Sequence, residues 1–233
     1  MSGILYGVGL GPGDPDLITV KSSRLISQAR VIAYPSLAGG ESFARSIAAD
    51  LISPDAEEIV MDVPMTVERA PAQAAYDIGA KNIAAVLDRG EDVVCLCEGD
   101  PFFYGSFMYL YARLAADYQV EVVPGVTSIT TCAARAGMPL AARNERLTVL
   151  PGPLPAEELR ARIEGAESVA IMKVGRHLSK IRAVIADLGL TDKAAYIERA
   201  SLPDELVCPL AQAPETAPYF SMIILTKGAD PWL

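Results

Sequence analysis

Apolar and polar positions follow two alternating patterns along the first half of the chain. Short apolar runs, typical of buried strands, lie at residues 4–9, 31–35, 58–61, 92–97 and 117–123. Apolar positions with helical spacing lie between them, at residues 15–29, 41–51, 73–89 and 107–114. This alternation of strands and helices predicts a mostly parallel sheet.

The second half of the chain repeats the alternation with more strands in succession. Expected strands lie at residues 146–150, 168–172, 194–198, 205–208 and 219–225, and expected helices at 130–136, 157–163 and 178–188. Because the last strands are compatible with hairpins, this half predicts a mixed sheet. We therefore expect two α/β domains, an N-terminal one over residues 1–120 and a C-terminal one over residues 121–233.

The loop at residues 98–106 connects a predicted buried strand to a predicted helix. It is therefore expected at the carboxyl end of a parallel sheet, where open α/β sheets bind ligands. Gly99 lets a ligand approach the backbone, and Asp100 places a hydrogen-bond acceptor beside it. The alternative interpretation is an ordinary connecting loop whose aromatic residues belong to the core.

A second glycine-rich loop, at residues 9–15, follows the first predicted strand. The dinucleotide-binding pattern GxGxxG fails here, because the third glycine position falls on Pro12 when counted from Gly7 and on Asp14 when counted from Gly9. The next predicted strand also ends without the acidic residue that holds a ribose. An enzyme that uses a nicotinamide cofactor is therefore disfavoured.

Composition narrows the possible functions further. The formal net charge of -9 argues against nucleic-acid binding, which needs a basic face. The four cysteines form no CxxC pair, and the single histidine, His177, has no Cys or His beside it, so we expect no metal site. Apolar surroundings predict buried, reduced thiols, typical of a cytoplasmic protein. No apolar stretch is long enough to span a bilayer, so no membrane attachment is expected.

Several glycine- and proline-marked motifs occur in a fixed order along the chain. They are GVGLGPGDP at residues 7–15, EGDPFFYG at 98–105, VPGVTS at 123–128, LPG at 150–152, MKVG at 172–175, IERAS at 197–201 and YFSMII at 219–224. Together they resemble the motifs of the tetrapyrrole methylases, and the resemblance covers nearly the whole chain. It implies two α/β domains with S-adenosylmethionine (SAM) in the cleft between them, and a homodimer.

Further runs at residues 102–110, 142–147 and 174–178 resemble the branch of this family that methylates carbon 20 of a tetrapyrrole. The resemblance implies methyl transfer from SAM to precorrin-2, giving precorrin-3A in cobalamin biosynthesis. Cobalt-factor II is the alternative substrate within the same branch. Relatives of the fold that methylate a protein or the ribose of ribosomal RNA, and a binding module without catalysis, are further alternatives.

The resemblance also assigns candidate site residues, motif by motif. The cofactor set is Pro12, Glu98, Gly99, Asp100, Phe103, Thr127, Ser128, Met172 and Ala200. The substrate set is Gly11, Gly13, Asp14, Lys21 and Tyr104. The cations available to the substrate carboxylates are Lys21, Arg24, Arg135, Arg143, Arg146, Lys173 and Arg176. No catalytic base is identified: Tyr104, Glu98 and His177 are conceivable, and each has an ordinary structural interpretation.

Overall fold

The computed structural model describes residues 2–37, 40–64 and 69–228. The chain divides into two compact units, residues 1–127 and 128–233. The division falls later than the expected boundary between residues 120 and 121, because the strand Gln119–Val123 still pairs within the first sheet. Each unit contains its own sheet and its own buried core.

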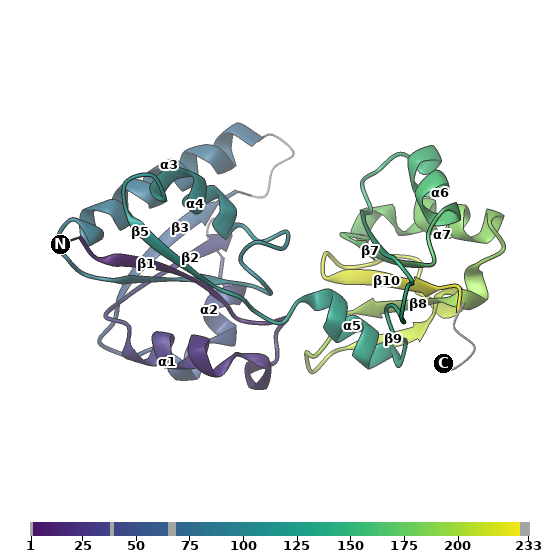
Figure 1. Ribbon diagram of the computed structural model, residues 1–233, viewed down its shortest axis with the longest axis horizontal. Coiled ribbons are helices and arrows are strands. Elements are labelled where there is room, and N and C mark those ends of the chain that lie inside the picture. Colours follow the sequence, from purple (N-terminus) through teal and green to yellow (C-terminus); the bar gives the residue numbers. More distant parts are fainter. Residues whose placement is uncertain (1, 38–39, 65–68, 229–233) are drawn as a thin grey trace. The chain divides into compact units, whose positions relative to one another are not determined.

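The first unit contains a five-stranded parallel sheet, as the sequence predicts (Figure 1). Its strands are β1 (Ile4–Gly9), β2 (Val31–Leu37), β3 (Glu57–Val63), β4 (Val93–Cys97) and β5 (Gln119–Val123), in the order β3-β2-β4-β1-β5. The central strand β4 is buried throughout, which explains its continuous apolar sequence. Its last residue, Cys97, pairs with Gly9 at the end of β1.

Helices cover both faces of this sheet. Two of them, α3 (Arg69–Leu87) and α4 (Phe107–Leu114), pack with Cys95 and Cys97 of β4 in one apolar cluster. The other two, α1 (Val20–Gln28) and α2 (Phe43–Ile47), pack with Val94 and Leu96, whose side chains point to the opposite face. The first unit is therefore doubly wound, with helices on both sides of a parallel sheet.

Two expected helices of the first unit are shorter than the sequence pattern indicates. The expected helix at residues 15–29 is divided into the 3-10 turn Pro15–Leu17 and α1, because Thr19 caps a new helix by accepting a hydrogen bond from the Ser22 backbone N–H. The expected helix at residues 41–51 is also divided, into α2 and the 3-10 turn Ala49–Leu51, here without a side-chain cap. Asp14 caps the first turn, as expected, by accepting from the Asp16 backbone N–H.

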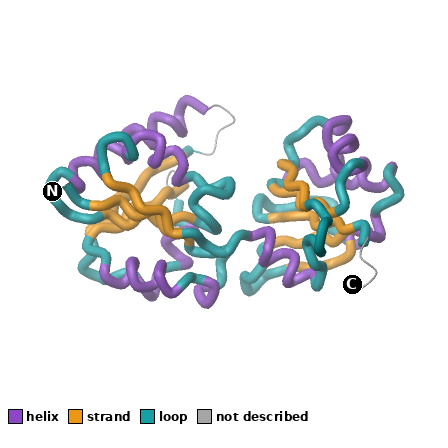
Figure 2. The backbone as a smooth tube through the Cα atoms, viewed as in Figure 1, coloured by secondary structure: helices purple, strands orange, loops and turns teal. Residues whose placement is uncertain are grey.

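The second unit contains the expected mixed sheet. Its strands are β6 (Leu147–Pro151), β7 (Ser168–Met172), β8 (Ala194–Glu198), β9 (Leu206–Pro209) and β10 (Ser221–Thr226), in the order β6-β7-β10-β8-β9. Strands β6 and β7 are parallel, and the remaining pairs are antiparallel. Helices α6 (Ala156–Glu164) and α7 (Leu178–Asp187) pack on one face, while α5 (Ser128–Ala136) contacts β8, β9 and β10 on the other (Figure 2).

Candidate functional site

The order of strands in the first sheet creates a switch point between β1 and β4. The chain leaves β1 toward β2 on one side of the sheet and leaves β4 toward β5 on the other, although β1 and β4 are neighbours. Loops that leave neighbouring strands in opposite directions open a crevice at their carboxyl ends, where ligands of open α/β sheets bind. The two glycine-rich motifs singled out in the sequence, at residues 9–15 and 98–106, are these two loops.

The two loops are joined through their backbones. Gly11 and Gly99 exchange hydrogen bonds, with N–H to O distances of 3.2 Å from Gly11 and 2.7 Å from Gly99. Both residues have positive φ, +78° at Gly11 and +63° at Gly99, a region that other residues rarely adopt. The glycines of these motifs are therefore needed for the backbone conformation that brings the two loops together.

The backbone at Gly99 is also open on the side where a side chain would stand. A Cβ atom added to Gly99 would meet no described atom within 4 Å. By contrast, a Cβ added to Gly9 would lie 2.6 Å from the Gly125 backbone. The main chain at Gly99 is therefore not covered by a neighbouring group, which the expected approach of a cofactor requires.

Asp100 holds the loop after β4 to the loop after β5. Its Oδ1 atom accepts hydrogen bonds from the backbone N–H groups of Phe102 and Phe103, at 2.9 and 3.0 Å. Its Oδ2 atom accepts from the Gly125 N–H at 3.1 Å. The sequence suggested Asp100 as an acceptor for the cofactor, and the structure shows that its carboxylate already binds three backbone groups.

Glu98 and Tyr104 lie on either side of this turn. Glu98 is half-buried, and burial raises the pKa of its carboxyl group, while a hydrogen bond from the Ala44 backbone opposes the shift. Tyr104 is 43% exposed, has a φ of +57°, and packs edge-to-face with Phe103 at a centroid distance of 5.2 Å. The candidate base residues therefore include one carboxyl that retains its proton more readily than usual.

The remaining site residues of the first unit border the same loops. Pro12 and Gly13 lie half-buried and buried, respectively, in the loop after β1, and Asp14 caps the turn that follows. Thr127 ends the first unit after β5. Lys21 near the start of α1 forms an ion pair with Glu121 of β5, so its ammonium group already has a partner.

Two site residues of the second unit, Met172 and Ala200, lie at the same end of the second sheet. Met172 ends β7 and pairs with Met222 of β10, and Ala200 follows the end of β8. The loop backbones are joined to the start of β10, since Arg199 N–H donates to Phe220 O at 2.9 Å and Gly175 N–H donates to Ser221 Oγ at 3.2 Å. Ser128 begins α5 in the same unit.

Non-glycine residues with a strained, left-handed backbone lie within the sequence motifs. The described non-glycine residues with positive φ are Tyr104, Arg143, Lys173, Arg199 and Ser201. All five lie in runs that resemble the methylase motifs. Such conformations cost free energy and cluster at ligand sites. Sequence reasoning missed this feature, because nothing in a tyrosine, lysine, arginine or serine indicates a left-handed backbone.

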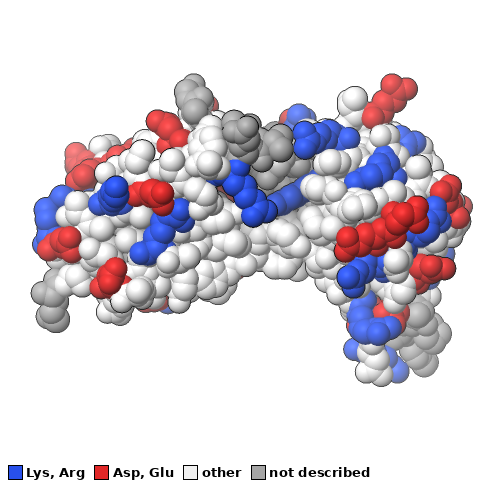
Figure 3. Space-filling model, turned by 90° about the horizontal axis from the view of Figure 1, so that it is seen from above, with Lys and Arg blue, Asp and Glu red and all other residues white. Residues whose placement is uncertain are grey.

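Several cations proposed for the substrate carboxylates have acidic partners. Besides Lys21, Arg135 bonds Glu205 and Arg146 bonds Glu167, each with a closest ion-pair distance of 2.7 Å. Acidic and basic side chains lie side by side over much of the visible surface (Figure 3). His177, near the start of α7, has a pKa lowered by burial and by the nearby charges of Lys180 and Arg176, so it is neutral at lower pH than an ordinary histidine.

The described residues contain neither a metal-binding cluster nor a membrane-spanning helix. No cluster of three or more His, Cys, Asp or Glu side chains in this part of the chain is arranged to hold a metal ion. None of its helices is both long and apolar enough to cross a membrane.

Residues 4–214 match the family model of the Tetrapyrrole (Corrin/Porphyrin) Methylases. The chain is 41% identical to a precorrin-2 C(20)-methyltransferase from a Sinorhizobium species, covering 99% of both chains. It is 32% identical to the cobalt-precorrin-2 C(20)-methyltransferase of Salmonella typhimurium, covering 97% of this chain and 98% of that one.

A solved structure agrees with these sequence relationships. The uroporphyrin-III C-methyl transferase from Thermus thermophilus complexed with S-adenyl homocysteine superposes with a TM-score of 0.70 at 25% identity, covering 97% of this chain and 98% of that one. Sequence motifs, strand order and full-length similarity therefore agree, and the chain belongs to the tetrapyrrole (corrin/porphyrin) methylases.

Proposed function

We propose that this protein is a SAM-dependent methyltransferase that transfers a methyl group to carbon 20 of precorrin-2 in cobalamin biosynthesis. The observation that carries the proposal is the 41% identity to a precorrin-2 C(20)-methyltransferase over 99% of both chains. The glycine loops at the switch point between β1 and β4 support it, because such a point is where open α/β sheets bind their ligands.

The residues at this edge of the first sheet fit the amino-acid and nucleoside parts of SAM. The Gly99 backbone borders open space, and Phe103 offers a half-buried ring in the same loop. Pro12, Glu98, Thr127 and, in the second unit, Ser128, Met172 and Ala200 complete the proposed cofactor set. SAM supplies a methyl group that its sulfonium sulfur already activates. The protein therefore has to bind and align the reactants and exclude water.

A proton has to leave the methylated carbon, and polar side chains of this protein can accept it. The ionised carboxylate of Glu98 can accept this proton, and its raised pKa favours holding it, while Tyr104 presents a hydroxyl on an exposed ring. Gly11, Gly13, Asp14, Lys21 and Tyr104 remain the proposed substrate residues. Of these, Lys21 has to exchange its partner Glu121 for a substrate carboxylate if it takes part.

The second candidate function is the same methyl transfer to the cobalt-containing ring. The 32% identity to a cobalt-precorrin-2 C(20)-methyltransferase supports it, and the higher identity to the metal-free type favours precorrin-2. A metal that arrives inside the ring needs no ligands from the protein. The fold therefore suits either substrate.

A turnover assay separates the two functions. The purified protein is incubated anaerobically with labelled SAM and either precorrin-2 or cobalt-factor II, and the product masses are read. One added methyl group on the metal-free ring alone is expected. Transfer to the cobalt form alone would retain the cofactor and reaction and change the substrate. Transfer to neither ring, with SAM still bound, would contradict the proposed acceptor.

A homodimer and a cytoplasmic location are proposed on family resemblance. Light scattering coupled to size-exclusion chromatography measures the first directly: the expected mass is twice the 24.7 kDa of the chain. A mass of one chain would contradict the proposed dimer and leave the proposed chemistry to the turnover assay.

A further inference from the structure

The Asp100 carboxylate is bonded to the protein's own backbone, whereas a ligand-binding carboxylate would have its oxygens free for the ligand. Its two carboxylate oxygens accept three backbone hydrogen bonds, from Phe102, Phe103 and Gly125. A carboxylate offers about four acceptor positions, so most of its capacity is used within the protein. Hydrogen bonds to a charged acceptor are stronger than neutral ones, so this side chain is firmly held.

The three loops around Asp100 meet through glycines. A Cβ on Gly125 would lie 2.0 Å from the carbonyl oxygen of Gly99 and 2.9 Å from the Cα of Gly9. The loop after β5 therefore lies directly on the loops after β4 and β1, with no side chain between them. Gly99 is in turn hydrogen-bonded to Gly11. The Asp100 carboxylate also bonds the third loop to this layer, through the Gly125 N–H.

Resting on the proposed methyl-transfer function, we propose that Asp100 is a positioning residue that acts through Gly125. Its carboxylate joins the loops after β4 and β5, and so fixes the Gly99 backbone and the segment leading to Thr127 where the methyl donor binds. It does not contact the donor itself. Its role is to set the shape of the binding loops before the donor arrives, so that less order has to be imposed on binding.

Asp100→Asn tests this role with a minimal change. The amide oxygen can accept from one side of the turn, but the amide NH₂ group cannot accept from a backbone N–H. One set of backbone donors, that of Gly125 or that of the turn, therefore loses its acceptor. The matched control is Asp55→Asn, which makes the same chemical change at an exposed position of the same unit.

The first measurement uses the ligand-free protein. Amide hydrogen exchange, followed by NMR, is compared at Gly125 in the wild type and both variants. Faster exchange at Gly125 or in the turn at Phe102 and Phe103 is expected for Asp100→Asn, and unchanged exchange for Asp55→Asn. Wild-type protection at all of these amides in Asp100→Asn would overturn the proposal.

The second measurement separates positioning from direct contact. Binding of S-adenosylhomocysteine, of its 2′-deoxy and 3′-deoxy analogues and of its deamino analogue is measured by calorimetry. Asp100→Asn is expected to weaken binding of the parent compound by roughly tenfold or more. Because positioning acts on the whole site, the loss caused by removing each ligand group should be the same in wild type and variant. If removal of one ligand group weakens binding to the wild type but not to Asp100→Asn, that group contacts Asp100 directly, which would overturn the proposal.

The two measurements also distinguish this inference from the proposed function. If the wild type does not bind S-adenosylhomocysteine, the proposed function fails. The exchange rate at Gly125 still shows whether Asp100 holds the loops after β4 and β5 together. If Asp100→Asn does not fold, Asp100→Ser takes its place. A serine hydroxyl accepts from the following turn but is too short to reach Gly125, so faster exchange at Gly125 and the same loss of affinity are expected.

Discussion

Gly125 and Gly99 lie in direct backbone contact, so that a methyl group added to Gly125 would lie 2.0 Å from the Gly99 carbonyl oxygen. Such an overlap with main-chain atoms requires one of the loops to move. We expect Gly125→Ala to lower the free energy of unfolding by roughly 2–3 kcal/mol, as overpacking commonly does. Urea unfolding followed by circular dichroism measures the change. A variant with wild-type stability would contradict the close approach of the two loops.

Gly99→Ala is the matched change on the other side of this contact. Its methyl group meets no described atom within 4 Å, so the expected cost is that of the left-handed backbone at φ +63°, about 1–2 kcal/mol. The methyl group would enter the space proposed for the cofactor, so binding of S-adenosylhomocysteine should be lost or strongly weakened. If calorimetry finds wild-type affinity in Gly99→Ala, the cofactor does not lie against this backbone.

The fold could be predicted from sequence where burial alone determines the pattern. Strand β4 is buried on both faces and its sequence is continuously apolar, so its position was evident. The prediction of one continuous helix over residues 15–29 was wrong, because the structure has a 3-10 turn followed by a separate helix. Its apolar spacing continues through the break, and Thr19 acts as a cap only because the chain is extended there. Local capping geometry of this kind is weakly encoded in the hydrophobic pattern.

The candidate site was predictable in its location and less so in its internal bonding. The glycines at positions 11 and 99 indicated close backbone approach, and the structure shows these two residues bonded to each other. The three partners of Asp100 were not foreseen, since one of them, Gly125, is distant in sequence and reaches Asp100 only through the order of the strands. Pairings of this kind depend on topology, which side-chain types do not specify.

The cysteines provide a test of the core. Burial raises the pKa of the Cys132 thiol to about 12 and that of Cys97 to about 11, and it raises the pKa of Cys95 further. Cys208 is only half-buried, and its pKa is also raised. Because the thiolate is the reactive form, native protein at pH 8 should be modified slowly, with Cys208 first. Peptide mass mapping after a short iodoacetamide pulse identifies the order, and early modification of Cys95 would contradict the buried strand.

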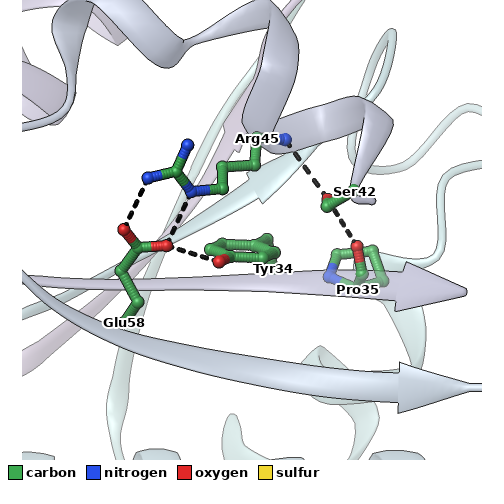
Figure 4. Close-up of polar contacts among 5 residues, drawn as sticks. All are labelled: Tyr34, Pro35, Ser42, Arg45 and Glu58. Atoms are coloured by element: carbon green, nitrogen blue, oxygen red, sulfur yellow. Dashed lines mark hydrogen bonds and ion pairs between the residues drawn. The ribbon is translucent and has the colours of Figure 1, made fainter. Parts of the chain in front are cut away.

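Acid stability should depend on the polar group formed by Tyr34, Arg45 and Glu58 (Figure 4). Two guanidinium hydrogen bonds of 2.8 Å from Arg45, with one from the Tyr34 hydroxyl, lower the pKa of Glu58 from 4.5 to about 2. A lowered pKa stabilises the folded state above the ordinary value, and this contribution is lost as the pH falls from 4.5 toward 2.

Glu58→Gln removes this contribution. At pH 7 the variant should be less stable by about 1–2 kcal/mol, a figure reduced for the solvent exposure of the Arg45 partner. The difference from wild type should shrink as the pH falls from 4.5 toward 2, because the wild-type carboxylate then becomes protonated. Asp62→Asn, at an exposed position on the same strand β3, is the control. Equal acid sensitivity of wild type and Glu58→Gln in urea titrations would contradict the ion pair.

The contribution of Glu98 to the stability of the fold should depend on pH in the opposite sense to that of Glu58. Burial raises the pKa of its carboxyl group above the ordinary value of 4.5, so the folded state holds this proton more tightly than the unfolded state does. Stability contributed by the group is therefore complete below the ordinary pKa and is lost as the pH rises through the raised pKa. Glu98→Gln carries a neutral side chain of similar size and should not show this loss.

The stability of Glu98→Gln relative to wild type should therefore increase with pH across the interval above 4.5 and become constant beyond the raised pKa. Glu57→Gln, which makes the same chemical change at an exposed position at the start of β3, is the matched control. Unfolding midpoints measured in urea at a series of pH values test the difference. If the curves of Glu98→Gln and wild type remain parallel, the carboxyl group ionises as freely in the folded protein as in the unfolded chain. A carboxyl group of that kind would not be suited to retaining a proton beside the proposed cofactor site.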